Sequence, residues 1–138
     1  MNDHASAASP RGTSPRFAAC GWRDRARLLA RGRWLLQSEL RKLARLPTHA
    51  ARSEVAQAQR TAAIRVLQHL RVDLQITGHE QPPTAPGLII ALHEGMADAL
   101  CLASLPWPLR FVARREVFEW AGIGTAMQRC GHIAIDPE

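Results

Sequence analysis

The chain has 138 residues, of which 46% are hydrophobic and 22% charged, a composition that fits one small globular domain and excludes a wholly disordered protein. The formal net charge of +6 is spread unevenly, because residues 1–71 hold 14 Lys and Arg against 4 Asp and Glu, whereas residues 72–138 hold 4 against 8. This asymmetry predicts a basic N-terminal region that faces phosphate groups, on lipid or nucleic acid, beside a more neutral domain.

Residues 1–20 are rich in Ala, Ser, Pro and Arg and are expected to form a disordered tail. They contain no continuous apolar region, so no secretory signal is expected. No run of about 18 apolar residues occurs in the chain, so no membrane-spanning helix is expected either. The three cysteines form no CxxC or Cys/His pattern, which predicts reduced thiols, no metal site and a cytoplasmic location. They are Cys20, Cys101 and Cys130.

The basic region 21–71 is expected to form two helices. In the first, over residues 24–46, leucines recur on one narrow stripe at 3.6 residues per turn, while arginines and Trp34 occupy the other sides. Pro47 ends this helix, and the second helix is expected over about residues 51–71. The leucines of the stripe are Leu29, Leu36, Leu40 and Leu43.

The first helix has two interpretations that the sequence leaves open. It covers the core with its arginines solvated, or it lies in a membrane interface with its leucines in the apolar layer and its arginines and Trp34 at the headgroups. Nucleic-acid binding ranks below both, because the chain has no recognised binding motif and no interleaved aromatic residues. We therefore expect a membrane surface, and no nucleic acid, among the partners.

From residue 72 onward the hydrophobic period changes, and expected strands alternate with expected helices. The fully apolar run Gly87–Leu92 is typical of an interior parallel strand, and residues 79–86 form a proline-rich loop. The sequence predicts an α/β domain over residues 72–138, with a mainly parallel sheet flanked by helices and preceded by the N-terminal helical region. Strands are expected over residues 72–78, 87–92, 109–113 and 132–136, and helices over 97–105 and 115–130, the last interrupted near residues 121–124.

A histidine and an aspartate follow the apolar run. His93 comes directly after it and Asp98 five residues later, with Gly95 between them. Reactive groups of α/β sheets collect where strands end, and a histidine oriented by a carboxylate can accept a proton from a hydroxyl. On one regular helix this spacing would leave the side chains about 140° apart. We therefore expect His93 in the turn and Asp98 one turn into the helix, with the carboxylate reaching back to Nδ1. Gly95 would leave the approach open and the backbone N–H groups at the helix start free for an anion.

These residues also have a structural interpretation. A histidine and an aspartate five residues apart are a common pattern, and a histidine at a strand end is more often a hydrogen-bonded loop residue than a base. In that case Asp98 would only favour the N-terminal end of a helix dipole. Glu94 is expected to face solvent. Taken alone, the pair does not decide between the two interpretations.

Three sequence blocks in order favour the catalytic interpretation. The first is His93 and Asp98 after a hydrophobic strand, the second is "FVARREV" at residues 111–117, and the third is "GHIAID" at residues 131–136. Together with the preceding "LRVDLQITG", these blocks cover about half of the chain. They resemble the glycerolipid acyltransferase family, of the lysophosphatidate acyltransferase type, which carries a His-x4-Asp motif, an "FVAK-x-E-L" block and a "G-x-I-x-I-D-R" block.

The resemblance implies an activity and a role for each site residue. His93 would be the general base that takes the proton from a glycerol hydroxyl, and Asp98 would orient it. The hydroxyl would attack the thioester of acyl-CoA or acyl-carrier protein, with no metal, no cofactor and no covalent enzyme intermediate. Arg114 and Arg115 would bind the acceptor phosphate, although a solvated basic pair at a strand end is an equally good interpretation.

The resemblance also implies a location and an extent. A basic amphipathic N-terminal region suits a peripheral enzyme whose lysophospholipid acceptor lies in a membrane. The family's "E-G-T-R" block has no counterpart in the sequence, so the chain is expected to contain the N-terminal part of the family fold. The alternative function is a truncated, non-catalytic module that binds lipid at the membrane surface.

Overall fold

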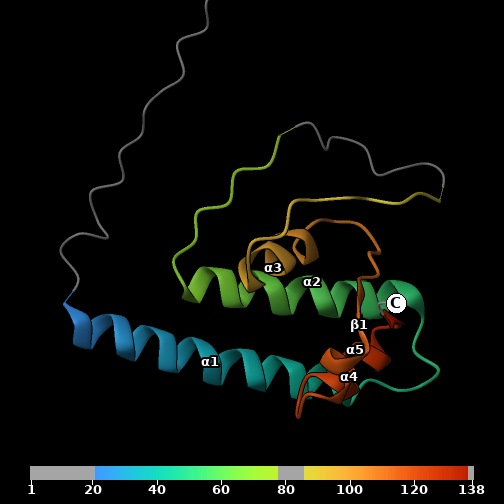
Figure 1. The fold of residues 1–138 in the computed structure, drawn as a ribbon, viewed down its shortest axis with the longest axis horizontal. Coiled ribbons are helices and arrows are strands. Elements are labelled where there is room, and N and C mark those ends of the chain that lie inside the picture. Colours follow the sequence, from blue (N-terminus) through green and yellow to red (C-terminus); the bar gives the residue numbers. More distant parts are fainter. Residues whose placement is uncertain (1–20, 78–85, 137–138) are drawn as a thin grey trace, which may run out of the picture.

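The computed structural model describes residues 21–77 and 86–136, and the expected tail and most of the proline-rich loop lie outside these residues. The fold is built on two long antiparallel helices, α1 over Trp22–Ala44 and α2 over Arg52–His69 (Figure 1). Both helices agree with the sequence prediction within two residues at each end. The first turns of α1 extend past the end of α2, because Gly32 already lies beside His69, the last residue of α2, and Leu70, which follows it.

The core lies where the C-terminal half of α1 meets α2 and a short helix near the C-terminus, α5 (Gly124–Arg129). Its central side chains are Leu43 of α1, Ala62 of α2, Ala126 of α5 and Cys130 just after α5. Burial raises the pKa of the Cys130 thiol to about 11, so this cysteine is an inert core residue.

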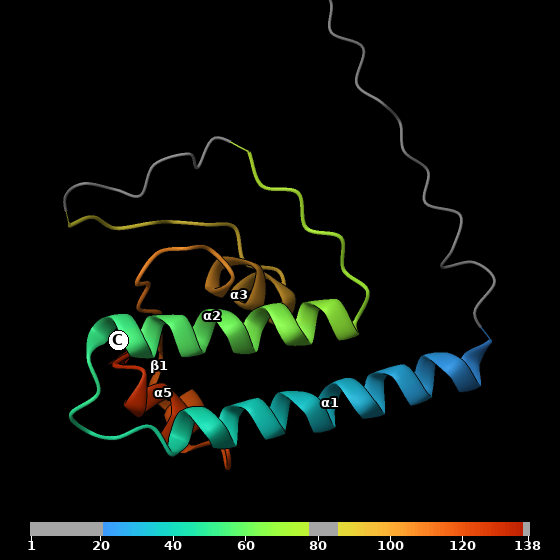
Figure 2. The same ribbon diagram turned by 180° about the vertical axis from the view of Figure 1, so that it is seen from behind.

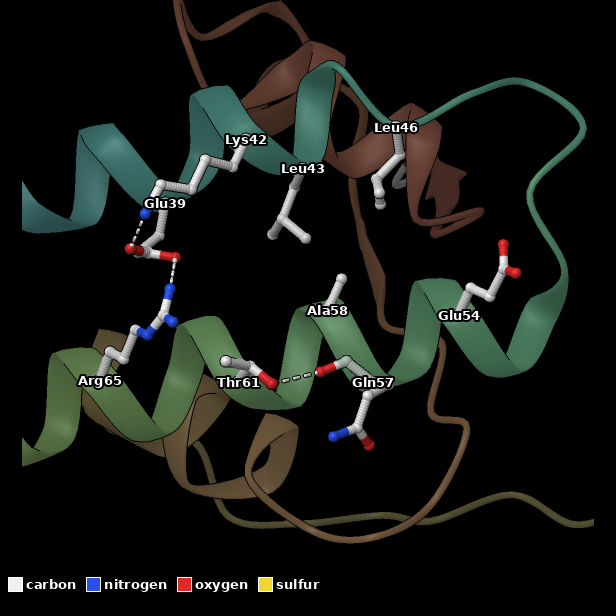
Figure 3. A pocket seen from close by; sticks show the side chains of 9 residues that line it. All are labelled: Glu39, Lys42, Leu43, Leu46, Glu54, Gln57, Ala58, Thr61 and Arg65. Carbon is white, nitrogen blue, oxygen red and sulfur yellow. Dashed lines mark hydrogen bonds and ion pairs between the residues drawn. The ribbon is translucent and has the colours of Figure 1, made fainter.

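A buried carboxylate joins α1 to α2. Glu39 is almost fully buried and accepts a hydrogen bond from Lys42 Nζ at 2.6 Å, and its other oxygen lies 3.4 Å from Arg65 Nη1 (Figure 3). A pocket of about 440 Å³ opens beside this cluster. It contains none of the site residues expected from the sequence, and its charged side chains Glu39, Lys42 and Arg65 are already paired with one another.

The C-terminal part forms a small β-α-β unit. Strand β1 (Val112–Arg114) pairs in parallel with β2 (Ile133–Ile135), with Val112 opposite Ile133. Because parallel strands need a crossover connection, α4 (Arg115–Glu119) and α5 lie between them in sequence. The fold is therefore broadly α/β, with two N-terminal helices before a two-stranded parallel sheet, as the sequence predicts for these two strands.

Two of the predicted strands do not form. Residues 72–77 and 87–92 are extended but have no secondary structure, and Leu92 is 92% exposed. The prediction of a buried strand at 87–92 is therefore wrong for this structure. A strand needs a neighbouring ladder to satisfy its N–H and C=O groups, and among the described residues β1 and β2 pair only with each other.

The predicted helix over residues 115–130 divides into α4 and α5 at the expected interruption. Gly124 begins α5 beneath the end of α4, and a Cβ at this position would lie 1.8 Å from the Phe118 carbonyl oxygen. No rotamer change can relieve an overlap with backbone. The break between the helices therefore depends on this glycine.

We expect Gly124→Ala to lower the free energy of unfolding by about 1–3 kcal/mol or more, because a backbone carbonyl must move to admit the methyl group. Gly32→Ala is the matched control, since its Cβ would meet side-chain atoms, the nearest being the end of the Leu70 side chain at 2.9 Å. Urea denaturation of the three proteins measures the difference. Equal midpoints for Gly124→Ala and Gly32→Ala would show that the tight approach at Gly124 does not exist.

His132 links the start of the C-terminal strand to β1. Its Nδ1 accepts a hydrogen bond from the Phe111 N–H at 3.0 Å, and the two rings lie 5.1 Å apart. Burial, assisted by the charge of Arg110, lowers the pKa of His132 to about 4. The low pKa of His132 is consistent with this hydrogen bond, because only a neutral imidazole can accept a hydrogen bond at Nδ1.

The structure should therefore lose stability when the pH falls from about 6.5 to 4. In this range unfolded chains bind a proton at His132 and folded chains do not, so acid favours unfolding, by roughly 3 kcal/mol at the lower limit. Urea melts at several pH values measure this dependence. His132→Asn keeps an acceptor oxygen but cannot take up the proton, so its slope should be smaller; an unchanged slope would exclude His132 as the cause.

Candidate active site

His93 and Asp98 lie at the start of α3 (Met96–Ala103), a helix that packs against α2 (Figure 1). Gly95 is the N-cap of α3, and Asp98 occupies its first turn. The carboxylate turns back, and Oδ2 accepts hydrogen bonds from the backbone N–H groups of Glu94 at 2.7 Å and Gly95 at 2.9 Å. Asp98 thus satisfies donors that the helix start would otherwise leave without a partner. The prediction that N–H groups here are free for an anion is therefore wrong for Glu94 and Gly95, because the carboxylate already occupies both.

The same carboxylate oxygen lies 3.4 Å from Nδ1 of His93. The residues meet because His93 stands before the helix, so the angular separation on a regular helix does not apply. This is the geometry expected from the sequence. The structural interpretation and the catalytic one are compatible here, since one carboxylate caps the helix and faces the imidazole at the same time.

The environment of Asp98 keeps its carboxylate charged. The backbone hydrogen bonds from Gly95 and Glu94, with a smaller effect of His93, lower the pKa of Asp98. A charged carboxylate at Nδ1 favours the tautomer with its proton on Nδ1 and stabilises the imidazolium. Nε2 is then the nitrogen that can accept a proton from a ligand.

The approach to this pair is open. The side chain of His93 is 68% exposed, and a Cβ placed on Gly95 would meet nothing within 4 Å. Glu94 is exposed, as expected. The site can therefore receive a hydroxyl compound from solvent or from a surface without a conformational change.

The two arginines expected to bind phosphate have different partners. Arg115 forms a bidentate ion pair with Asp136, with Nε 2.6 Å from Oδ1 and Nη2 2.7 Å from Oδ2. This pair raises the pKa of Arg115 and lowers that of Asp136. The Arg114 guanidinium donates from Nη2 to the exposed Glu116 carboxylate at 3.2 Å. Of the two, Arg114 is the better placed to exchange its partner for a phosphate.

Sequence reasoning missed the pair between Arg115 and Asp136. The signal was present in the expected parallel sheet, because residues that follow two paired parallel strands lie at the same edge. Arg115 follows β1 and Asp136 follows β2, with Arg114 opposite Ile135 in the register.

The structure does not bring all the expected site residues together. α3 packs on α2, whereas α4 and α5 lie by the C-terminal half of α1 (Figures 1 and 2). Within residues 21–77 and 86–136, no hydrogen bond or ion pair joins Arg114 or Arg115 to His93 or Asp98. His93, Asp98 and Gly95 form one cluster, and the arginines form another.

Two further properties of the described residues bear on the chemistry. They contain no group of three or more His, Cys, Asp and Glu side chains that could hold a metal ion. None of their helices has both the length and the apolar composition needed to cross a bilayer.

Comparison with known proteins gives one finding. Residues 73–138 match the family model described as Acyltransferase. No curated protein and no solved structure matches the chain. The matched region begins just after α2 and includes His93, Asp98 and both arginines.

Proposed function

Because residues 73–138 match the acyltransferase family model, we propose that this chain transfers an acyl group from an acyl thioester to the hydroxyl of a lysophospholipid-type acceptor. The observation that carries the proposal is the 3.4 Å approach of Asp98 Oδ2 to His93 Nδ1 inside the matched region. The donor would be acyl-CoA or acyl-carrier protein.

In the proposed reaction His93 acts as the general base. Nε2 takes the proton of the acceptor hydroxyl while the oxygen of that hydroxyl attacks the thioester carbonyl. The tetrahedral intermediate then expels the thiolate, which recovers the proton from the imidazolium. Asp98 stabilises the imidazolium throughout. Because the hydroxyl attacks the donor thioester directly, the proposed reaction uses neither a covalent enzyme intermediate nor a metal ion.

The remaining site residues would position the acceptor. The open space at Gly95 leaves room for the hydroxyl beside His93. Arg114, whose partner Glu116 is exposed, would bind the acceptor phosphate. We assign Arg115 a smaller role in phosphate binding, because Asp136 already occupies the Nε/Nη2 edge of its guanidinium.

The first turns of α1 support a second proposal, binding to a membrane surface. Trp22, Leu29 and Trp34 are all exposed on this helix, among several arginines. Tryptophan, leucine and arginine together suit the boundary between headgroups and acyl chains. A peripheral, cytoplasmic enzyme would reach its lipid acceptor in this way, and a non-catalytic lipid-binding module would use the same surface.

One experiment distinguishes acyl transfer from non-catalytic lipid binding. Thiol release from hexadecanoyl-CoA, and in parallel from acyl-carrier protein, is measured with and without lysophosphatidate in detergent micelles. An acyltransferase gives release that depends on the acceptor. If neither donor releases thiol, while the chain still sediments with vesicles that contain anionic phospholipid, the lipid-binding module is the better description.

A further inference from the structure

The apolar segment before His93 has no partner strand in the structure. Residues 87–92 are extended, and no backbone hydrogen bond joins them to another of the described residues. Because side chains alternate along an extended chain, Leu88, Ile90 and Leu92 share one face, and they are 79%, 88% and 92% exposed. An exposed, uncharged segment of this kind is a template for pairing with the open edge of a sheet.

Strand β1 provides an open edge. The Phe111 carbonyl accepts a hydrogen bond from the Ile133 N–H at 2.8 Å, so Phe111 directs its carbonyl to β2. Since successive residues of a strand direct their backbone groups to opposite sides, Val112 directs its N–H and C=O away from β2, and Arg114 does the same with its N–H. Among the residues that the structure describes, β1 pairs with β2 alone. Its second edge can therefore accept a further strand.

The segment and this edge are separated within one copy of the chain. Residues 87–92 lead into α3, which packs on α2 and is held there by a hydrogen bond from Arg60 Nε to the Ser104 carbonyl at 3.0 Å. In both Figure 1 and Figure 2, α2 lies between this segment and the helices α4 and α5 that follow β1. Pairing within one copy would require α3 to leave α2. A second copy can supply the edge while every contact of the structure is kept.

Pairing between copies would also join the two clusters of site residues. The existing sheet is parallel, and a parallel third strand brings its carboxyl end to the carboxyl end of β1. His93 directly follows the segment, and Arg114 is the last residue of β1. His93 of one copy would therefore lie at the same end of the sheet as Arg114 of the partner subunit.

We propose that two copies of the chain exchange residues 87–92, each segment adding in parallel to β1 of the other copy, so that each site combines His93 of one copy with Arg114 of the partner subunit. The exchange itself is argued from geometry, whereas the shared site rests on the proposed acyl transfer. A reciprocal exchange closes at two copies and forms two strand pairings in each dimer. It also enlarges each sheet to three strands, the size at which a small sheet becomes stable by itself.

Sedimentation equilibrium of the full chain tests the exchange without turnover, and the wild-type chain should form dimers and nothing larger. Ile90→Pro removes an N–H group from the segment in both copies, so the dissociation constant of the dimer should rise about tenfold or more. Ile90→Thr is the matched control, since it makes the side chain polar but keeps the N–H group and the branched Cβ; it should keep the dimer. A chain that is monomeric at every concentration, or equal weakening by the two variants, would overturn the exchange.

Mixing His93→Ala with Arg114→Ala tests the shared site. At a subsaturating lysophosphatidate concentration both variants should be slow on their own, because every site of such a dimer lacks one of the two residues. A mixed dimer has one intact site, so the mixture should recover about a quarter of the wild-type thiol release, since about half of the dimers are mixed. No recovery, with an active wild type, would overturn the shared site. Dimers that Ile90→Pro dissociates, without thiol release from the wild type, would support the exchange and contradict the proposed function instead.

Discussion

Replacement of His93 by alanine is expected to lower the turnover number for acyl transfer by about 10²–10⁴-fold, because the acceptor hydroxyl loses its general base. The side chain of His93 is mostly exposed, and its close polar contact is Asp98. The substitution should therefore leave the fold intact. Circular dichroism and the urea midpoint verify the fold, and acceptor-dependent thiol release measures the rate.

The control for this variant is His49→Ala. His49 is exposed in the connection between α1 and α2, outside the acyltransferase match. The same removal of an imidazole there should leave the rate unchanged. If the His93→Ala protein retained the wild-type rate, the contact between His93 and Asp98 at the start of α3 would have a structural role only.

Asp98→Asn should give the second large loss of turnover, on the order of 10²-fold or more. Oδ2 of Asp98 accepts two backbone hydrogen bonds and faces His93 at the same time. An amide is neutral and has only one oxygen acceptor. The variant can still cap α3 through that oxygen, but it can neither stabilise the imidazolium nor favour the productive tautomer.

Glu94→Gln is the matched control for Asp98→Asn, since it removes the charge of an exposed neighbouring carboxylate. Its rate should remain within a small factor of wild type. The pH dependence of the two rates gives a further test. Because the pKa of Asp98 is lowered, the wild-type carboxylate stays charged at and above its ordinary pKa. The ratio of wild-type to Asp98→Asn rates should therefore stay large from pH 6 to 8. A ratio near one would remove Asp98 from the mechanism.

The elements that the sequence predicts well are those fixed by local patterns. The leucine stripe and Pro47 locate α1, and the glycines of "AGIG" locate the break between α4 and α5. The strand expected at 132–136 shortens to Ile133–Ile135, and the strand expected at 109–113 is shorter and ends one residue later, as Val112–Arg114. Over the described residues 72–77 and 87–92 the two other expected strands do not form, because a strand depends on a partner distant in sequence, which a local pattern cannot supply.

The same distinction applies to the candidate site. The approach of His93 to Asp98 involves residues five apart at a helix start, so its geometry follows from local turn and capping preferences. The pairing of Arg115 with Asp136 depends on the strand register and was missed. That no hydrogen bond or ion pair joins Arg114 to His93 depends on how α3 packs on α2 and α5 packs on α1, which no motif encodes.

Acyl transfer itself is tested most directly by following the acyl group. The chain is incubated with hexadecanoyl-CoA labelled with ¹³C in the acyl chain and with lysophosphatidate, and the lipids are analysed by mass spectrometry. We predict a diacyl product that carries the label, with its formation lost in His93→Ala. Thiol release without labelled diacyl product, or the same product from both proteins, would contradict the assignment of His93 as the base of an acyltransferase.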